Sequence, residues 1–324
     1  MGDSNTTNSK VSSTGDLLLS DNTKVLFGDI RDSPYWNIFL LAIAWSLTLT
    51  TSTLLTTIGP LSAVYLGASD TLAAFTIGVF LIGAAVSSVP SGWLFRVHGR
   101  FKGFSVGCIC QIIGSGMGSF AMLTSSLYAL YIACFFIGLG QGLGQFYRFS
   151  AVELTPKELK SSAVTYVLAG GVLAAFLGPT GASYSANLFS QDYQGSFVII
   201  AGVGILNQAT IMLVKFPPAP AKTLQNVDDV PKRSNYEIVS QPLFIVSCAV
   251  ATIAHTIMIM IMVRRHFNSV RRLFCVIELS CLKSNVSVDM SNNGYSFDAT
   301  ALVMELHFFA MFSPGFISGT LTLE

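Results

Sequence analysis

The chain has 324 residues, of which 52% are hydrophobic and 11% are charged, and its mean hydropathy is +0.61. A soluble domain carries about 25% charged residues, so this composition excludes a soluble globular domain and indicates an integral membrane protein. The formal net charge of +1 discriminates little between classes of membrane protein, whereas the positions of the cations along the chain are informative.

Eight apolar stretches are long enough to cross a bilayer, which takes about 20 residues. We predict helices at residues 37–58, 72–95, 103–123, 127–149, 162–183, 195–214, 241–262 and 299–321. Short connections join the first six, so consecutive helices are expected to pack antiparallel as one bundle. The chain then divides into a polar tail, a six-helix bundle, a linker rich in proline and charge, and a partial second bundle: residues 1–34, 35–214, 215–240 and 241–324.

Basic residues occur in every second connection between the predicted helices. The tail, the second-to-third connection, the fourth-to-fifth connection and the linker all contain Lys or Arg, whereas three connections contain none: residues 59–71, 124–126 and 184–194. Cytoplasmic loops of membrane proteins carry the excess of Lys and Arg. This pattern predicts that the N-terminus and the linker are cytoplasmic, in the plasma membrane or an internal membrane.

The first helix carries hydroxyl side chains inside its apolar span. Thr50, Thr53 and Thr57 lie on one face and are candidates for contact with a solute. The alternative is structural, because Ser and Thr can donate hydrogen bonds to carbonyls of their own helix.

A short basic turn, VPSGWLFRVHGRFKGF at residues 89–104, connects the second and third helices. Gly92, Leu94, Gly99 and Arg100 form the pattern G-x-L-x-x-x-x-G-R, and Lys102 follows. This turn resembles the loop between helices two and three of the major facilitator superfamily. The resemblance implies an all-α polytopic membrane protein with two six-helix bundles, in which a solute binds near the midplane and is exposed alternately to each side.

The resemblance makes this turn part of a cytoplasmic gate, but the charges differ from the family pattern. Arg96 stands where the family has an acidic residue, and Val97 replaces a usual arginine. Arg148 and Glu153, near the inner end of the fourth helix, could form a substitute network with Arg96 and Arg100. The alternative is that Arg148 extends to lipid headgroups. The predicted gate therefore comprises Gly92, Leu94, Arg96, Gly99, Arg100, Lys102, Arg148 and Glu153.

The fourth helix contains the glycine-rich run at residues 138–145. Its glycines are spaced as small-xxx-small pairs, which let helices approach closely in lipid. The end of this run resembles the helix-four motif of the superfamily, whose arginine is replaced by Gly138. Gln141 and Gln145 are candidates for lining a cavity; the alternative is that they hydrogen-bond neighbouring helices.

The fifth helix contains Gly178, Pro179 and Gly181 in the order G-P-x-G. This segment resembles the element of superfamily antiporters in which a kinked helix allows the two bundles to rock. We predict a hinge at these three residues.

Residues 263–283 carry five cations on the predicted outer side and interrupt the resemblance to helices seven and eight. One interpretation is a retained intron in the gene model; the other is a real, amphipathic basic loop. Without this insert the resemblance covers residues 35–262 and 284–321, about 8 of the family's 12 helices.

Ionisable side chains are costly inside membrane spans and are therefore functional candidates. The candidates for solute or proton binding are His255, Asp289, Glu305 and His307. A histidine could exchange a proton near neutral pH; the alternative is a histidine satisfied by a helix carbonyl. Glu305 and His307, two residues apart, cannot face the same cavity.

The sequence predicts transport of a small neutral or zwitterionic organic solute, driven by a solute or proton gradient. The partners are that solute and the lipid bilayer, and we expect a monomer with no nucleic acid. Nucleophile motifs, paired carboxylates, zinc spacings and phosphate-binding loops are not found, so we predict no enzyme, no cofactor and no metal site. The alternative is a degenerate, non-transporting relative of the family, or a receptor or scaffold.

Overall fold

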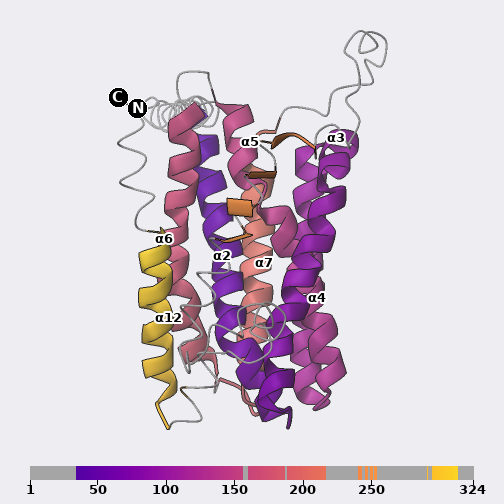
Figure 1. Cartoon of the computed structure of the whole chain (residues 1–324), viewed down its shortest axis with the longest axis vertical. Coiled ribbons are helices and arrows are strands. Elements are labelled where there is room, and N and C mark those ends of the chain that lie inside the picture. The colour runs from indigo at the N-terminus through magenta and orange to yellow at the C-terminus, as the bar shows by residue number, and fades with distance from the viewer. Residues whose placement is uncertain are drawn as a thin grey trace, which may run out of the picture.

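The computed structural model describes residues 34–155, 160–186, 188–216 and 294–312, and also 240–242, 245–246, 249–250, 252–253 and 290. These residues contain no strand, and the chain is an all-α bundle (Figure 1). The helices with defined bounds are α2 (Pro34–Tyr65), α3 (Asp70–Leu123), α4 (Leu127–Gly144), α5 (Tyr147–Leu154), α6 (Lys160–Ser185), α7 (Gln194–Leu213) and α12 (Phe297–Phe312).

Five helical segments within the described residues are long and apolar enough to cross a membrane. One of them, α3, has 54 residues and would be about 80 Å long if it were straight, at 1.5 Å per residue. The hydrocarbon core of a bilayer is about 30 Å thick. Helix α3 therefore supplies two spans, which brings the number of crossings before residue 216 to six, as the sequence predicted.

Gly99 divides α3 into two arms. Its backbone has φ 83° and ψ 163°, a combination that only glycine adopts without strain. The connection predicted between residues 95 and 103 is therefore in the right place but too long, because a single residue reverses the chain and its neighbours on both sides stay helical.

The two arms meet just below this reversal. A Cβ added at Gly103 would lie 2.5 Å from Cε1 of Phe95, so the second arm approaches the first through a position without a side chain. The Phe95 ring continues into an aromatic cluster, with its centroid 4.8 Å from that of Phe104, which lies 4.4 Å from the Tyr147 ring. Gly92, by contrast, has open space around it.

The fourth predicted helix, residues 127–149, is wrong in one respect. Helix α4 ends at Gly144 and α5 begins at Tyr147. The amide of Phe146 donates to the carbonyl of Leu143, at 3.2 Å, which is the tighter i to i−3 pattern of a 3₁₀ turn. This local tightening separates the two helices.

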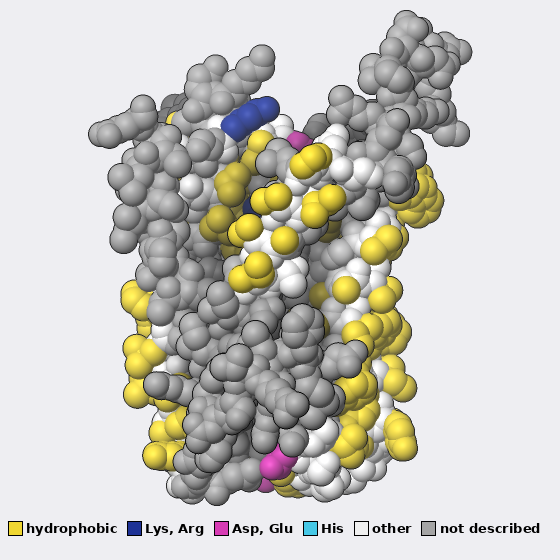
Figure 2. All heavy atoms as spheres, viewed as in Figure 1, with side chains coloured by type: hydrophobic (Ala, Val, Ile, Leu, Met, Phe, Trp, Pro, Cys, Tyr) yellow, Lys and Arg dark blue, Asp and Glu magenta, His cyan; other side chains and the backbone are white. Residues whose placement is uncertain are grey.

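Apolar side chains fill the interior and also cover the outside. The interior holds two apolar clusters, one around Trp45, Phe104 and Tyr147 and the other around Ile58 and Phe197. Exposed Leu, Ile, Val and Phe side chains cover the long sides of the bundle, where Figure 2 shows hydrophobic atoms at both lateral edges. Such a surface is stable only against lipid.

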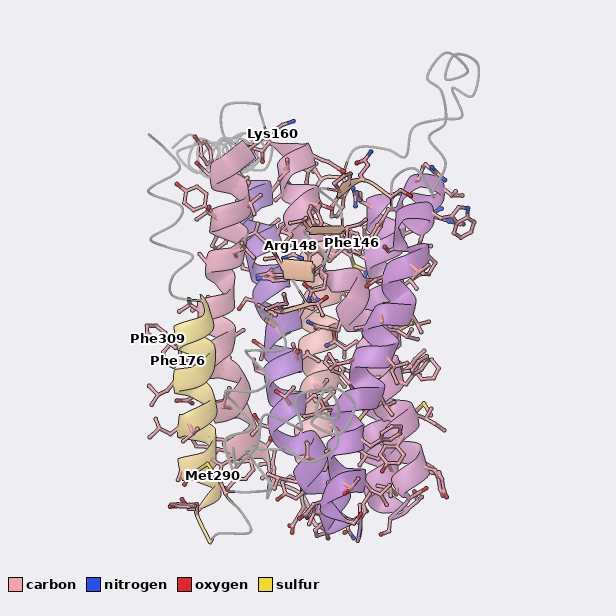
Figure 3. All side chains as sticks on the ribbon, in the orientation of Figure 1. Phe146, Arg148, Lys160, Phe176, Met290 and Phe309 are labelled. Atoms are coloured by element: carbon pink, nitrogen blue, oxygen red, sulfur yellow. The ribbon has the colours of Figure 1, made fainter. Side chains whose placement is uncertain are left out.

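Helix α12 contains part of the eighth predicted span and packs on α6. The rings of Phe176 and Phe309 lie 5.7 Å apart, and Ser183 donates a hydrogen bond to Asp298 (Figure 3). These pairs run in opposite directions along the two helices, so α12 is antiparallel to α6. Most of the linker 215–240 and all of the insert 263–283 lie outside the described residues, and the division into two bundles stays a prediction.

The conformation of Gly99 leads to a first prediction. Gly99→Ala adds a Cβ to a residue whose φ and ψ angles only glycine adopts without strain. We expect it to lower the free energy of unfolding by about 1–3 kcal/mol. The measurement is the midpoint of thermal unfolding in detergent. Gly92→Ala is the matched control, because its added methyl group meets open space. Equal midpoints for the two variants would contradict the assignment of the reversal to Gly99.

Candidate functional site

Arg100, directly after the Gly99 reversal, forms an ion pair with Glu153 of α5. Its Nε donates to Glu153 Oε2 at 2.9 Å and its Nη2 donates to Oε1, so the pair is bidentate. The guanidinium also lies over the Phe95 ring, 4.9 Å from the centroid. The pair ties the turn between the two arms of α3 to the end of the following span.

The other gate residues surround this pair in different ways. Leu94 is half-buried against the apolar cluster around Trp45, whereas Gly92, Arg96 and Lys102 are exposed. Arg148 does not join the pair, although the sequence placed it in the same network. Its Cζ lies over the rings of Trp45 and Phe149, at 5.7 and 5.2 Å from their centroids.

The glycines of α4 face three different helices. A Cβ at Gly138 would meet the carbonyl oxygen of Phe80, and one at Gly142 would meet that of Ala84, both on the first arm of α3. A Cβ at Gly140 would lie 2.6 Å from the carbonyl oxygen of Gly107 on the second arm. A Cβ at Gly144 would be 2.6 Å from Thr48 Cγ2 of α2. Helix α4 is thus held at backbone contact with both arms of α3 and close to a side chain of α2.

The two candidate glutamines lie at the end of α4. Among the described residues, Oε1 of the buried Gln141 has no hydrogen-bond partner; Gln145, directly after α4, is half-buried. Arg148 follows in α5, beyond the 3₁₀ turn at Phe146, so helical spacing does not relate its direction to that of the glutamines. These polar groups are the strongest candidates for a solute-facing surface.

The three candidate threonines of α2 are buried and bond to backbone carbonyls. Thr50 and Thr57 donate to the carbonyls of Ser46 and Thr53, each at 2.9 Å. Thr53 lies 3.0 Å from the carbonyl of Leu49 and 3.2 Å from that of Ala174 on α6. Their hydroxyls are occupied in this conformation, and contact with a solute stays a prediction.

The predicted hinge lies at the contact between α6 and α2. A Cβ at Gly178 would meet Thr53 Oγ1, whereas one at Gly181 would lie 3.5 Å from Leu54 Cδ1, an ordinary contact. Helix α6 continues through Pro179 to Ser185. These observations place Gly178 in an interface inside the bundle, and the hinge function stays a prediction.

Two buried amides that the sequence analysis did not single out connect the spans. Gln111 Nε2 donates to Thr51 Oγ1 at 2.8 Å, and Asn207 Nδ2 donates to Thr48 Oγ1 at 3.0 Å. Each is a side-chain amide inside a predominantly apolar span, and that is the signal that could have identified it. In lipid such side chains hold helices together.

Of the ionisable candidates in the last part of the chain, Glu305 is described in full. It is half-buried on α12, and Thr180 Oγ1 of α6 donates a hydrogen bond to its Oε1. His255, Asp289 and the side chain of His307 lie outside the described residues. Within the described part of the chain, no group of three His, Cys, Asp or Glu side chains could hold a metal ion.

Comparisons with known proteins agree with this architecture. Residues 26–279 match the family model of the Major Facilitator Superfamily. The chain is 23% identical over 286 residues to the riboflavin transporter RfnT of Brucella anthropi, an alignment that covers 88% of this chain and 66% of that protein. It is 21% identical over 277 residues to the uncharacterized MFS-type transporter YdeG of Bacillus subtilis, which covers 82% of this chain and 59% of that protein.

The fold is also similar to a solved structure. The crystal structure of a D-xylose–proton symporter superposes with a TM-score of 0.56 at 16% identity, covering 90% of this chain and 68% of that one. At this identity the likeness shows the fold alone. The chain spans less than two thirds of the length of RfnT and YdeG, two of the curated relatives that it matches.

The packing of α4 leads to a second prediction. Gly142→Val places a branched side chain against the backbone of Ala84, and overpacking of this kind costs about 1–3 kcal/mol. We expect a lower midpoint of thermal unfolding and a smaller monodisperse fraction in size-exclusion chromatography. Gly116→Val is the matched control, because Gly116 is exposed with open space around it. The α4 contact would be dispensable if both variants behaved like the unmodified protein.

Proposed function

The chain belongs to the major facilitator superfamily, and we propose that it forms the first bundle and part of the second bundle of a secondary transporter. In this proposal a small organic solute crosses the membrane by alternating access, driven by a solute or proton gradient. The solute would bind near the midplane, between the two bundles. A transporter rather than an enzyme is also what the relatives of this chain support.

The observation that carries the proposal is the Arg100–Glu153 ion pair at the Gly99 reversal. The side chain of Arg100 is 21% exposed and that of Glu153 is 53% exposed, and an exposed pair of this kind contributes about 0–1 kcal/mol. A contact of this size can form in one conformation and break in the other without a large barrier. We propose that it closes the cytoplasmic side of the carrier in one of its states.

The sidedness of the proposal rests on the distribution of cations. In the described connections, residues 66–69, 124–126 and 188–193 contain no Lys or Arg. The basic residues instead occur at the other end of the bundle, where Figure 3 places Lys160. Because cytoplasmic loops carry the excess of basic residues, we propose that this end and the N-terminus are cytoplasmic.

The solute and the coupling ion are further parts of the proposal. The likeness to a riboflavin transporter makes riboflavin the first solute to test. The half-buried Glu305, which accepts a hydrogen bond from Thr180 between α12 and α6, is the described residue best placed for proton coupling.

The ion pair leads to a third prediction. Arg100→Ala removes up to about 1 kcal/mol of stabilisation from the conformation in which the ion pair is formed. We therefore expect riboflavin uptake to fall by up to about fivefold. Glu153→Arg should impair uptake more, and the exchange of both charges, Arg100→Glu with Glu153→Arg, should restore part of it. The measurement is initial uptake of labelled riboflavin into cells that express the chain.

The control for this experiment is Lys160→Ala, at the same end of the bundle but outside the pair. Full activity of Arg100→Ala would contradict the proposed role of the pair. If riboflavin and a panel of other small organic solutes accumulated no faster than in cells without the chain, transport itself would be excluded.

Sidedness gives a fourth prediction. In a chain whose six cysteines are replaced, we expect Arg96→Cys to resist a membrane-impermeant maleimide in intact cells and to react after permeabilisation. Ser190→Cys, in the exposed connection at the opposite end, should react in intact cells. The reverse pattern would show that the basic end is outside.

A further inference from the structure

Two side-chain N–H groups at the contact of α2 with α5 lack an acceptor among the residues that the structure describes. Within that part of the chain, Trp45 is 3% exposed and its Nε1 makes no hydrogen bond, and the buried Nε of Arg148 makes none either. Arg148 Cζ lies 5.7 Å from the centroid of the Trp45 ring, so the two side chains that carry these donors are neighbours. A buried N–H without an acceptor is unfavourable, and two such donors beside a positive charge fit an anionic oxygen.

No protein carboxylate neutralises this charge among the residues that the structure describes. Within that part of the chain, no Asp or Glu lies within 4.0 Å of an Arg148 nitrogen. Glu153, five residues further along the chain, is bound on both of its oxygens by Arg100. An unpaired arginine inside a membrane span is rare and marks a functional position.

The surroundings of Arg148 favour a ligand inside the bundle over a lipid headgroup. A cation that extends to the headgroups would point toward the end of its span. In Figure 3 Arg148 lies below Lys160, further from the end of the bundle. Its guanidinium covers Trp45, which belongs to one of the two interior apolar clusters.

We propose that Arg148 and Trp45 form an anion subsite, which binds a carboxylate or phosphate group of the solute. Gln141 lies in the preceding helix α4, and its Oε1, unpartnered among the described residues, can accept a hydrogen bond from another part of the same molecule. The proposal deepens the proposed function and rests on it for the claim that the bound anion is transported. It keeps the zwitterionic solute of the sequence analysis and replaces the neutral one by an organic anion. Riboflavin carries neither a carboxylate nor a phosphate group, so an anionic or zwitterionic solute is favoured over riboflavin for this subsite.

The experiment measures binding without transport. In the full chain with Trp36→Phe and Trp93→Phe, Trp45 is the remaining tryptophan, and its fluorescence reports on the subsite. We would titrate benzoate and phenyl phosphate, with benzamide and benzyl alcohol as neutral counterparts of similar size. We expect a saturable change with at least one of the two anions and at least tenfold weaker binding of its neutral counterpart.

Arg148→Gln should weaken the binding of that anion at least tenfold, whereas Arg148→Lys should keep part of it. Lys160→Gln, an exposed cation on α6, is the control and should bind normally. An unchanged midpoint of thermal unfolding checks that each variant is folded. Lack of saturable binding by both anions, or equal affinity in Arg148→Gln, would overturn the proposal.

Nanodiscs separate a free anion from a lipid headgroup. If the solute is the ligand, benzoate or phenyl phosphate binds equally in phosphatidylcholine and in phosphatidylglycerol discs. Competition by phosphatidylglycerol would assign the site to a headgroup and overturn the solute subsite. Failure of transport with intact anion binding would reject the proposed function alone, whereas transport that Arg148→Gln leaves unaffected would reject the subsite alone.

Discussion

The structure depends on the close approach of α4 to three neighbouring helices. Water does not drive helices together inside a bilayer, so their association relies on packing and on hydrogen bonds between them. Gly138 and Gly142 bring α4 to the first arm of α3, Gly140 brings it to the second arm, and Gly144 brings it to α2. Because these four positions have no room for a side chain, the polar group that α4 carries near its end is placed elsewhere, at the buried Gln141.

The polar contacts between helices are of two kinds, which differ in how deeply their side chains are buried. The amides of Gln111 and Asn207 are buried and bond to hydroxyls of α2, so breaking either would leave an unsatisfied group in a medium without water. The Arg100–Glu153 pair is partly exposed, and water can replace each partner when it opens. The first kind holds the bundle together, and the second kind can open and close at little cost.

Much of the fold could be predicted from the sequence, because spans and their direction depend on hydropathy and on cation position. The position of the chain reversal was predicted correctly, but the pattern alone cannot tell which glycines make the reversal and the contact of the two arms possible. Gly92 belongs to the recognised motif and faces open space, whereas Gly103 lies outside it and allows the arms to meet. The partners of Arg148 were missed for a similar reason, since Trp45 is far away in sequence and no spacing rule connects them.

The replacement of the expected helix-four arginine by Gly138 has a steric explanation that also bears on Arg148. A Cβ at position 138 would collide with the carbonyl oxygen of Phe80, so no arginine fits there while α4 lies against the first arm of α3. The cation of this span instead belongs to the separate helix α5, beyond the turn at Phe146. There the Trp45 ring supports the Arg148 guanidinium without neutralising it. Close packing of α4 and a positive charge on the same span are thus compatible because they belong to different helical segments.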